Sequence, residues 1–251
     1  MTQVTEIWRH PIKSHGREAL QSVALEAGKT MPWDRVWAVA HEAARLAPDA
    51  TEWAPCANFS RGSKAPALMA ISAEVNEETG KITLTHPDQG TCVVDPEDAA
   101  DAADFIAWTR PLCPKDRAQP DRIYKAAGRG LTDSDFPSVS IIGHASCRAL
   151  ADAMGAEVSP LRFRGNIWLD GDLAPFEEFD WVGREFTIGG VTFRGMERIE
   201  RCLATTANPA TGRRDLDTLG ALRGTLGHID MGIRAEVVAG GTVSLGDICT
   251  A

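Results

Sequence analysis

The residues best suited to chemistry in this sequence lie in a short polar segment, RCLATTANPATG, at positions 201–212. The preceding stretch, 191–200, has the composition of a β-strand, and the proline and glycine inside the segment indicate a turn. Cys202 is therefore predicted at a strand end, where a side chain can project into a site. Its thiolate is the form that attacks electrophiles or binds soft metals, and positive charge from Arg198 and Arg201 would favour it. The alternative is that Cys202 is a small buried hydrophobic residue.

The remaining cysteines are widely spaced along the chain: Cys56, Cys92, Cys113, Cys147 and Cys249. No two cysteines form a C-x-x-C pair, which argues against a zinc ribbon or an iron–sulfur domain. In a reducing compartment we expect all of them to be free thiols. The sequence assigns these five no role beyond packing.

A second group of chemically suitable residues lies near the start of the chain. A strand predicted over residues 4–8 runs into the loop 10–16, where a proline ends the pairing of the strand. In this loop Lys13 and Ser14 place a positive charge next to a hydroxyl group, a pair that suits a phosphate. The alternative is a solvated surface loop.

Arginines accompany two further predicted strands. Arg35 lies at the beginning of an apolar stretch, 34–39, that is typical of a buried strand. An arginine beside buried aromatic residues needs a partner, either a carboxylate such as Asp34 or Glu42 or a bound anion. In the strand predicted over 162–170, two arginines are two positions apart and so share a face. That face is either a surface stripe or a site for an anion or a heterocycle.

The composition indicates a folded protein that binds neither nucleic acid nor membrane. The 251 residues include 26 Lys and Arg against 35 Asp and Glu, which gives a net charge of −9. An acidic chain with no long basic run is not expected to bind nucleic acid, although it leaves room for local basic pockets. The start of the chain lacks a signal-peptide pattern, and no apolar run is long enough to cross a bilayer. We therefore expect a cytoplasmic protein with no membrane partner.

Strands separated by Gly- and Pro-containing turns dominate the predicted structure. Helices are expected over 97–110, 144–154 and 216–226, and a proline-rich linker over 111–120. The last strands, 231–238 and 242–245, are expected to form a hairpin. This pattern favours a mainly β fold, a barrel or sandwich with helical decorations, over a doubly wound parallel sheet. The glycine-rich Rossmann motif, the P-loop and the G-x-S-x-G elbow are all absent from the sequence.

Four segments together resemble the two-part MOSC proteins (molybdenum cofactor sulfurase C-terminal domain), which include the mitochondrial amidoxime-reducing component and its bacterial relatives. The segments are IWRHPIKS at 7–14, DRVWAV at 34–39, FRGNI at 163–167 and RCLATTANPATG at 201–212. They occur in the family's order and extend over nearly the whole chain. The resemblance implies an N-terminal β-barrel-like domain over 1–115 and a MOSC β-barrel domain over 116–251, with the cofactor between them.

The resemblance also implies a molybdenum cofactor (molybdopterin) and the residues that bind it. Cys202 matches the cysteine whose thiolate binds molybdenum in the family. The other positions assigned to the cofactor are Lys13, Ser14 and Arg35 for the pterin's phosphate, and Arg164, Asn166, Thr205, Thr206, Asn208 and Asp133 for the pterin and its surroundings. Asn208 stands where the family usually has aspartate, and Gly165 where it usually has proline.

The activity implied by the resemblance is reduction of N-hydroxylated, amidoxime-type small molecules at a cysteine-ligated molybdenum. The chain carries no ferredoxin-like extension, so a separate electron-donor protein is expected. Two alternatives remain open. The chain is either a carrier, which holds sulfur on Cys202 as a persulfide or passes on molybdenum cofactor without turnover, or a ligand-binding barrel whose cysteine is inert.

Overall fold

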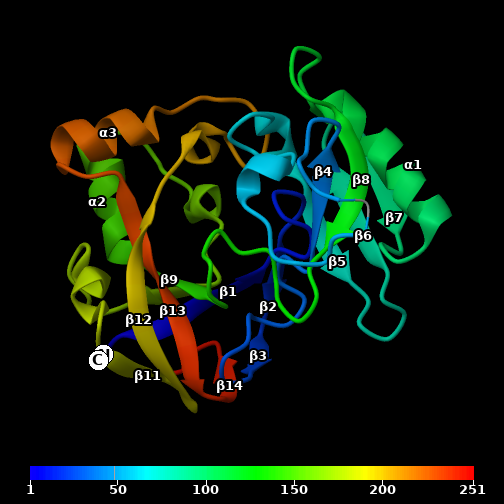
Figure 1. Ribbon diagram of the computed structural model, residues 1–251. Coiled ribbons are helices and arrows are strands. Elements are labelled where there is room, and N and C mark those ends of the chain that lie inside the picture. Colours follow the sequence, from blue (N-terminus) through cyan, green and yellow to red (C-terminus); the bar gives the residue numbers. More distant parts are fainter. Residues whose placement is uncertain (48) are drawn as a thin grey trace.

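Eight strands form the largest sheet of the computed structural model, which describes residues 1–47 and 49–251 (Figure 1). Their order across the sheet is β15, β11, β12, β13, β9, β10, β1 and β2. These strands are β1 (Gln3–Arg9), β2 (Glu18–Leu20), β9 (Val139–Gly143), β10 (Ile167–Asp170), β11 (Glu185–Ile188), β12 (Val191–Glu200), β13 (Asp230–Ala239) and β15 (Cys249–Thr250). Strands from both ends of the sequence therefore share one sheet.

The main feature of the topology is that strands from the beginning of the chain pair with strands from its second half. β1 runs antiparallel to β10, with Ile7 opposite Ile167, and β10 runs parallel to β9. β3 (Ser22–Leu25) pairs with β14 (Gly241–Ser244) in a separate ribbon. The beginning of the chain is therefore hydrogen-bonded to segments that follow it by more than a hundred residues.

Smaller sheets form the other side of the molecule. β4 (Trp37–His41) pairs with β8 (Pro120–Lys125), and β5 (Ser72–Val75), β6 (Ile82–His86) and β7 (Gly90–Val94) form a meander. Helix α1 (Ala99–Thr109) packs against β7 and β8, and Asp98 caps it by accepting hydrogen bonds from the backbone N–H groups of its first turn. α2 (His144–Met154) and α3 (Thr218–Thr225) pack together beside the large sheet (Figure 1).

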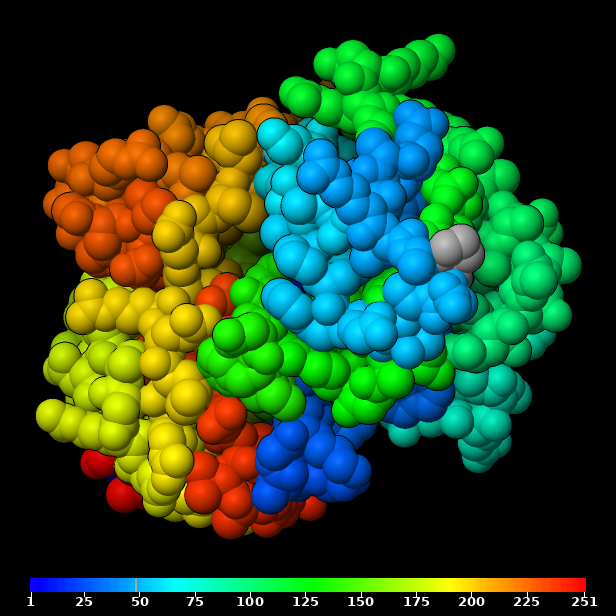
Figure 2. Space-filling model, viewed as in Figure 1, coloured from blue at the N-terminus to red at the C-terminus, as the bar shows by residue number. Residues whose placement is uncertain are grey.

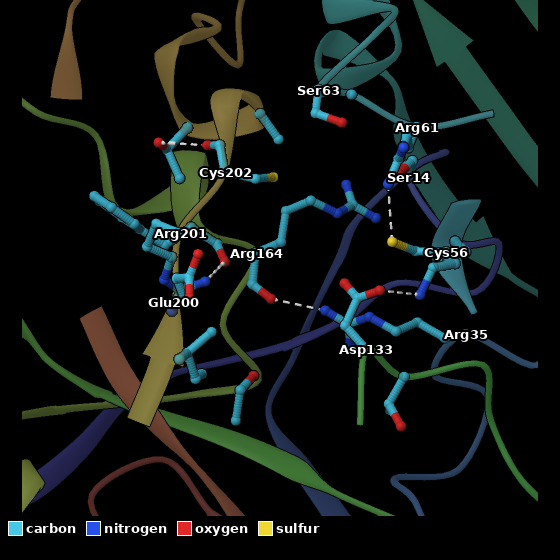
Figure 3. Close-up of a pocket in the computed structure, with 18 of the residues that line it drawn as sticks. Ser14, Arg35, Cys56, Arg61, Ser63, Asp133, Arg164, Glu200, Arg201 and Cys202 are labelled. Atoms are coloured by element: carbon cyan, nitrogen blue, oxygen red, sulfur yellow. Dashed lines mark hydrogen bonds and ion pairs between the residues drawn. The ribbon is translucent and has the colours of Figure 1, made fainter. Parts of the chain in front are cut away.

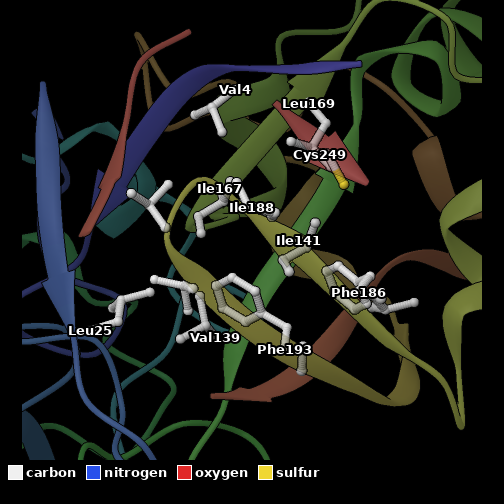
Figure 4. Close-up of a cluster of buried hydrophobic side chains, with 14 of the residues drawn as sticks. Val4, Leu25, Val139, Ile141, Ile167, Leu169, Phe186, Ile188, Phe193 and Cys249 are labelled. Carbon is white, nitrogen blue, oxygen red and sulfur yellow. The ribbon is translucent and has the colours of Figure 1, made fainter. Parts of the chain in front are cut away.

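The large sheet buries one face in an apolar core. Burial alternates along β11 and along most of β12, where the inward residues include Phe186, Ile188 and Phe193. Figure 4 shows these side chains packed with Val4 from β1 and Ile141 from β9. Because β1 supplies part of this core, the first strand is as firmly held as the strands around it.

The prediction of a mainly β fold with helical decorations is confirmed, but the expected barrels are not closed. β15 and β2 are the two edge strands of the large sheet. A single bridge joins Gln3 to Ile248, and the Val4 N–H donates to the Asp247 carbonyl at 2.9 Å. The sheet thus curls until β1 touches the segment before β15. No helix in the described part of the chain has the length and apolar character needed to span a membrane.

Three local predictions were wrong in detail. The stretch 162–170 is a strand only from Ile167, because a short 3-10 helix (Pro160–Phe163) and a left-handed Arg164 precede it. The third helix begins at Thr218, capped by Asp217. β13 and β14 form no hairpin, because β14 pairs instead with β3 in a separate two-stranded sheet.

The left-handed residue that ends α2 gives a test of local stability. Gly155 follows α2 with φ of 60°, and a Cβ there would meet no atom within 4 Å. Gly155→Ala is therefore expected to lower the free energy of unfolding by about 1 kcal/mol, from backbone strain alone. The matched control is Gly224→Ala in α3, which also has open space and a right-handed backbone.

The control should instead raise stability by about 0.5 kcal/mol, because alanine favours a helix over glycine. Both changes can be measured by urea unfolding. Equal effects of the two substitutions would contradict the assignment of Gly155 as the helix-ending residue.

Candidate functional site

A cleft of about 280 Å³ lies between segments from the first half and the second half of the sequence. In Figure 2 a hollow separates the gold segment near residue 200 from the cyan segment near residue 60. The cleft is lined by the loop after β1, by Arg35, by residues of 56–63 and 132–140, and by segments 162–166 and 199–205. Eight of the predicted site residues line it: Lys13, Ser14, Arg35, Asp133, Arg164, Asn166, Cys202 and Thr205.

Cys202 lies directly after β12, at the start of a short 3-10 helix (Leu203–Thr206). It is exposed, whereas Cys113, Cys147 and Cys249 are buried. It is therefore not the small buried hydrophobic residue of the alternative interpretation. Its carbonyl accepts the Thr205 N–H at 3.2 Å and the Thr205 hydroxyl at 3.1 Å, which fixes the backbone. Figure 3 shows its sulfur pointing away from β12 into the cleft.

Arg201 provides positive charge beside this thiol. Its guanidinium donates to the carbonyls of Phe163 and Met231, at 2.9 Å each. Burial, together with repulsion from Arg234, lowers the pKa of Arg201 to about 9, so it remains cationic at neutral pH. Arg198, which the sequence also suggested, instead lies over the ring of Phe179 at 4.5 Å. The charge beside Cys202 thus comes from one of the two predicted arginines.

Lys13 reaches the cleft from the loop after β1. Its ammonium group donates to the Leu131 carbonyl and to Asp133 Oδ1, at 2.5 and 2.7 Å. Burial lowers the pKa of Lys13, and the carboxylate of Asp133 opposes that shift. Asp133 comes from the loop that follows β8 and is itself exposed. The predicted pterin contacts Lys13 and Asp133 are therefore an ion pair across the cleft wall.

Arg35 has an internal carboxylate as partner, one of the options left open by the sequence. Its guanidinium pairs with Asp34, and its Nη2 donates to the Arg164 carbonyl at 2.9 Å. Asp34 is fully buried and also accepts the backbone N–H of His10 at 2.7 Å. Burial alone would raise the pKa of the Asp34 carboxyl, but Arg35 and His10 together hold it well below its usual range.

Arg164 has an unused donor at this site. Its Nη2 donates to the Gly16 carbonyl at 2.9 Å, while its Nη1 is buried and has no hydrogen-bond partner in the described residues. Burial, followed by repulsion from Arg35 and Arg17, lowers the pKa of Arg164 to about 9. An anion in the cleft would relieve that repulsion and give the free N–H a partner.

Three residues that line the cleft have a left-handed backbone: Ser14 (φ 64°), Arg35 (φ 53°) and Arg164 (φ 50°). This conformation is uncommon for residues other than glycine, and such strain costs roughly 1–3 kcal/mol per residue. It turns each side chain away from the direction that a regular strand would give. Nothing in the residue types marks these positions, so sequence reasoning missed this feature.

The remaining predicted residues are already engaged. Asn166 donates to the Trp8 carbonyl at 3.1 Å and accepts from the N–H and hydroxyl of Ser140, so its amide joins β1, β9 and β10. Thr206 and Asn208 do not line the cleft. The Thr206 hydroxyl donates to the Leu203 carbonyl at 2.8 Å, and the Asn208 amide donates to Asp215 at 2.7 Å.

The sequence analysis missed several lining residues, including Cys56, Arg61, Glu200 and Arg234. Arg162 also lines the cleft, and it is one of the two arginines for which the sequence left open a surface stripe or a site for an anion or a heterocycle. Cys56 and Arg61 come from a stretch that looks like an ordinary polar loop, so no signal in the sequence marks them. The Arg61 Nη1 donates to the Cys56 sulfur at 2.9 Å (Figure 3). No group of three or more His, Cys, Asp or Glu side chains in the described residues could hold a metal ion.

The cleft carries an excess of positive charge. Six arginines and one lysine line it, against Asp133 and Glu200. Four of these cations have carboxylate partners, but within residues 1–47 and 49–251 none of Arg61, Arg164 and Arg201 forms an ion pair. An anion is therefore the ligand class that this arrangement favours.

Two family models match the chain in sequence. The model of the MOSC N-terminal β-barrel domain matches residues 1–117, and that of the MOSC domain matches residues 131–250. The chain is a MOSC-domain protein. MOSC domains are associated in general with binding of the molybdenum cofactor.

Solved structures also show similarity to this MOSC-domain protein. A crystal structure of the YuaD protein from Bacillus subtilis is 14% identical, covers 98% of this chain and 93% of its own, and has a TM-score of 0.47. The structure of YiiM from Geobacillus stearothermophilus is 15% identical over 45% of this chain and 52% of its own, with a TM-score of 0.35. No curated protein is significantly similar to the chain in sequence.

The buried pair of Asp34 and Arg35 predicts a pH-dependent stability of this MOSC-domain protein. Asp34→Asn should lower the free energy of unfolding by about 3 kcal/mol at pH 7, because it leaves Arg35 without its counter-charge. The folded-state pKa of Asp34 lies below its unfolded value, so the stability that it contributes is complete above the unfolded pKa of about 3.9. That contribution decreases as the pH falls further.

The difference in stability between the parent protein and the variant should therefore shrink below about pH 4, as measured by urea unfolding across pH. The control is Asp121→Asn, which removes an exposed carboxylate paired with Arg122 and should change stability by less than about 0.5 kcal/mol. A constant difference down to pH 2 would contradict the assigned role of Asp34.

Proposed function

We propose that this protein is a molybdenum-cofactor-dependent oxidoreductase of the cytoplasm that reduces N-hydroxylated, amidoxime-type compounds, with Cys202 as the protein ligand of molybdenum. The observation that carries the proposal is that the exposed Cys202 thiol shares a cleft with three arginines that have no carboxylate partner in the described part of the chain. A thiolate is a soft ligand, and the uncompensated cations suit a phosphate. The cleft therefore offers both groups that the cofactor requires.

The donor set of the cleft fits such a cofactor. The buried, unpartnered Nη1 of Arg164 calls for an acceptor from a bound molecule. Lys13, Ser14, Arg35 and Arg164 would hold the phosphate, and Cys202 would bind the metal at the other side of the cleft. When bound, the cofactor supplies the two-electron redox chemistry, while the protein provides binding, orientation and charge.

The protein's own groups have defined parts in this proposal. Arg201 keeps positive charge next to Cys202, the residue that would bind the metal. Asp133 holds Lys13 in place against the cleft wall, and Asn166 fixes the relative position of β1 and β10 on the cleft floor. Electrons would come from a separate donor protein, and the substrate would be a small N-oxygenated molecule.

A carrier function is the second candidate, and one feature favours it. Cys56 lines the same cleft as Cys202, and Arg61 donates a hydrogen bond to its sulfur. A second thiol in the same cleft would suit a protein that receives and passes on sulfur as a persulfide. Such a carrier would hold sulfur on Cys202 and catalyse no turnover of its own.

The two functions can be separated with Cys202→Ser and the matched control Cys92→Ser, which changes a half-buried cysteine on β7, outside the cleft. Protein purified from a host that makes molybdenum cofactor is assayed for metal content by mass spectrometry and for reduction of an aryl amidoxime with an artificial electron donor. The enzyme should contain about one molybdenum per chain and lose most of it in Cys202→Ser only.

A persulfide on Cys202 with no molybdenum in the parent protein would reject the oxidoreductase and support the carrier. Molybdenum content that is unchanged in Cys202→Ser would instead reject Cys202 as its ligand. In that case the cysteine has no part in the cofactor site.

Arg164 gives a second test of the cofactor site. Arg164→Gln removes the free N–H and one positive charge, so the cofactor should dissociate about tenfold more readily, as judged by molybdenum content after dialysis. Arg148→Gln removes an exposed arginine that pairs with Asp170 outside the cleft and should leave the metal content unchanged. Equal retention in both variants would argue against a phosphate at Arg164.

A further inference from the structure

A second cavity, of about 230 Å³, lies next to the cleft. It is formed by the end of β4, the 3-10 helix Cys56–Asn58 with the residues that follow it, and the turn 113–118. Arg61 lines both spaces, so the two are neighbours. The cavity is smaller than the pockets of roughly 300–1,000 Å³ that hold drug-sized ligands, so it suits a smaller molecule.

The cavity has an apolar base. Phe59 and Ala65 are buried there, and Ala57, Pro114 and Ala118 add further carbon surface. Burial raises the pKa of the Cys113 thiol to about 11, so this group is neutral at physiological pH. The base therefore favours the apolar part of a ligand and brings no negative charge.

Three cations surround this base: Arg61, Lys64 and Arg117. Among the residues that the structure describes, no carboxylate lines the cavity. In residues 1–47 and 49–251 neither Arg61 nor Lys64 forms an ion pair, and Arg117 reaches only the exposed Asp116, at 4.0 Å. In a chain of net charge −9, this local excess of positive charge is unusual, and it favours an anion.

Two buried polar atoms of the lining residues lack partners. Ser60 is 7% exposed, and its hydroxyl oxygen forms no hydrogen bond among the described residues. His41 donates from Nε2 to the Ala57 carbonyl at 2.8 Å, and its buried Nδ1 has no partner in the part of the chain that the structure describes. Buried polar groups are rarely left unpaired, so these atoms call for a ligand that can bond to them.

We propose that this cavity is a binding site for a small organic anion, an apolar group that carries a phosphate or a carboxylate. The apolar part lies on Phe59 and Ala65, and the anionic group is held by Lys64, Arg117 and the Ser60 hydroxyl. Arg61 joins this site to the cleft, because the same guanidinium donates to Cys56. The proposal stands independently of the molybdenum cofactor, since none of its evidence comes from Cys202.

The test is calorimetric titration of the purified full-length protein with phenyl phosphate, benzoate, inorganic phosphate and phenol. Phenyl phosphate or benzoate should bind more tightly than phosphate and phenol, which each match only half of the site. The double variant Lys64→Gln/Arg117→Gln should weaken this binding at least tenfold. Ser60→Ala should weaken it severalfold. The control Lys115→Gln, an exposed lysine in the same turn but outside the cavity, should change it less than twofold.

Binding that survives the double variant but is lost in Arg35→Gln would place the anion in the cleft and overturn the proposal. Equal affinity for phenol and phenyl phosphate would overturn it as well, because charge would then have no part in recognition. Tighter binding of benzoate or of phenyl phosphate identifies a carboxylate or a phosphate as the preferred anionic group. None of these outcomes depends on whether the protein contains molybdenum.

Discussion

The pairing of β1 with β10 is the interaction on which the rest of the site depends. It places the loop that contains Lys13 and Ser14 next to the segment that contains Arg164, although about 150 residues separate them in sequence. Asn166 strengthens this join, since its amide bonds to β1 and to Ser140 of β9. Side chains of both β1 and β10 are buried in one core, so the cleft walls are held by packing as well as by hydrogen bonds.

The cleft shows how a protein keeps positive charge available for a ligand. Buried arginines usually receive carboxylate partners, as Arg35 and Arg162 do here. Arg164 and Arg201 instead donate to backbone carbonyls, which do not cancel their charge, and the Arg164 Nη1 has no hydrogen-bond partner among the described residues. The left-handed backbone at Ser14, Arg35 and Arg164 adds strain at the same place, and strain of this kind is commonly found at functional sites.

Features that depend on neighbouring residues could be predicted from the sequence. The bounds of α2 follow from its apolar spacing and from Gly155, and α1 ends close to Pro111 as expected. Features that depend on partners distant in sequence could not be predicted in this way. β14 lies beside β3 rather than β13. Arg162 pairs with Asp215, whereas Arg164 forms no ion pair among the described residues, although both line the cleft. For the site, the four segments located most of the cleft, but Cys56 and Arg61 reach it only through the fold, and Thr206 and Asn208 bond elsewhere.

The pairing of early strands with late ones also determines when the cleft can form during synthesis. β1 emerges from the ribosome long before its partner β10, which follows only after some 160 further residues have been added. Until then the apolar face of β1 has no sheet to join, so the nascent chain exposes an unpaired strand edge for much of translation. Any cofactor or ligand that requires both walls must therefore be loaded after the later lining segments, 162–166 and 199–205, have been translated.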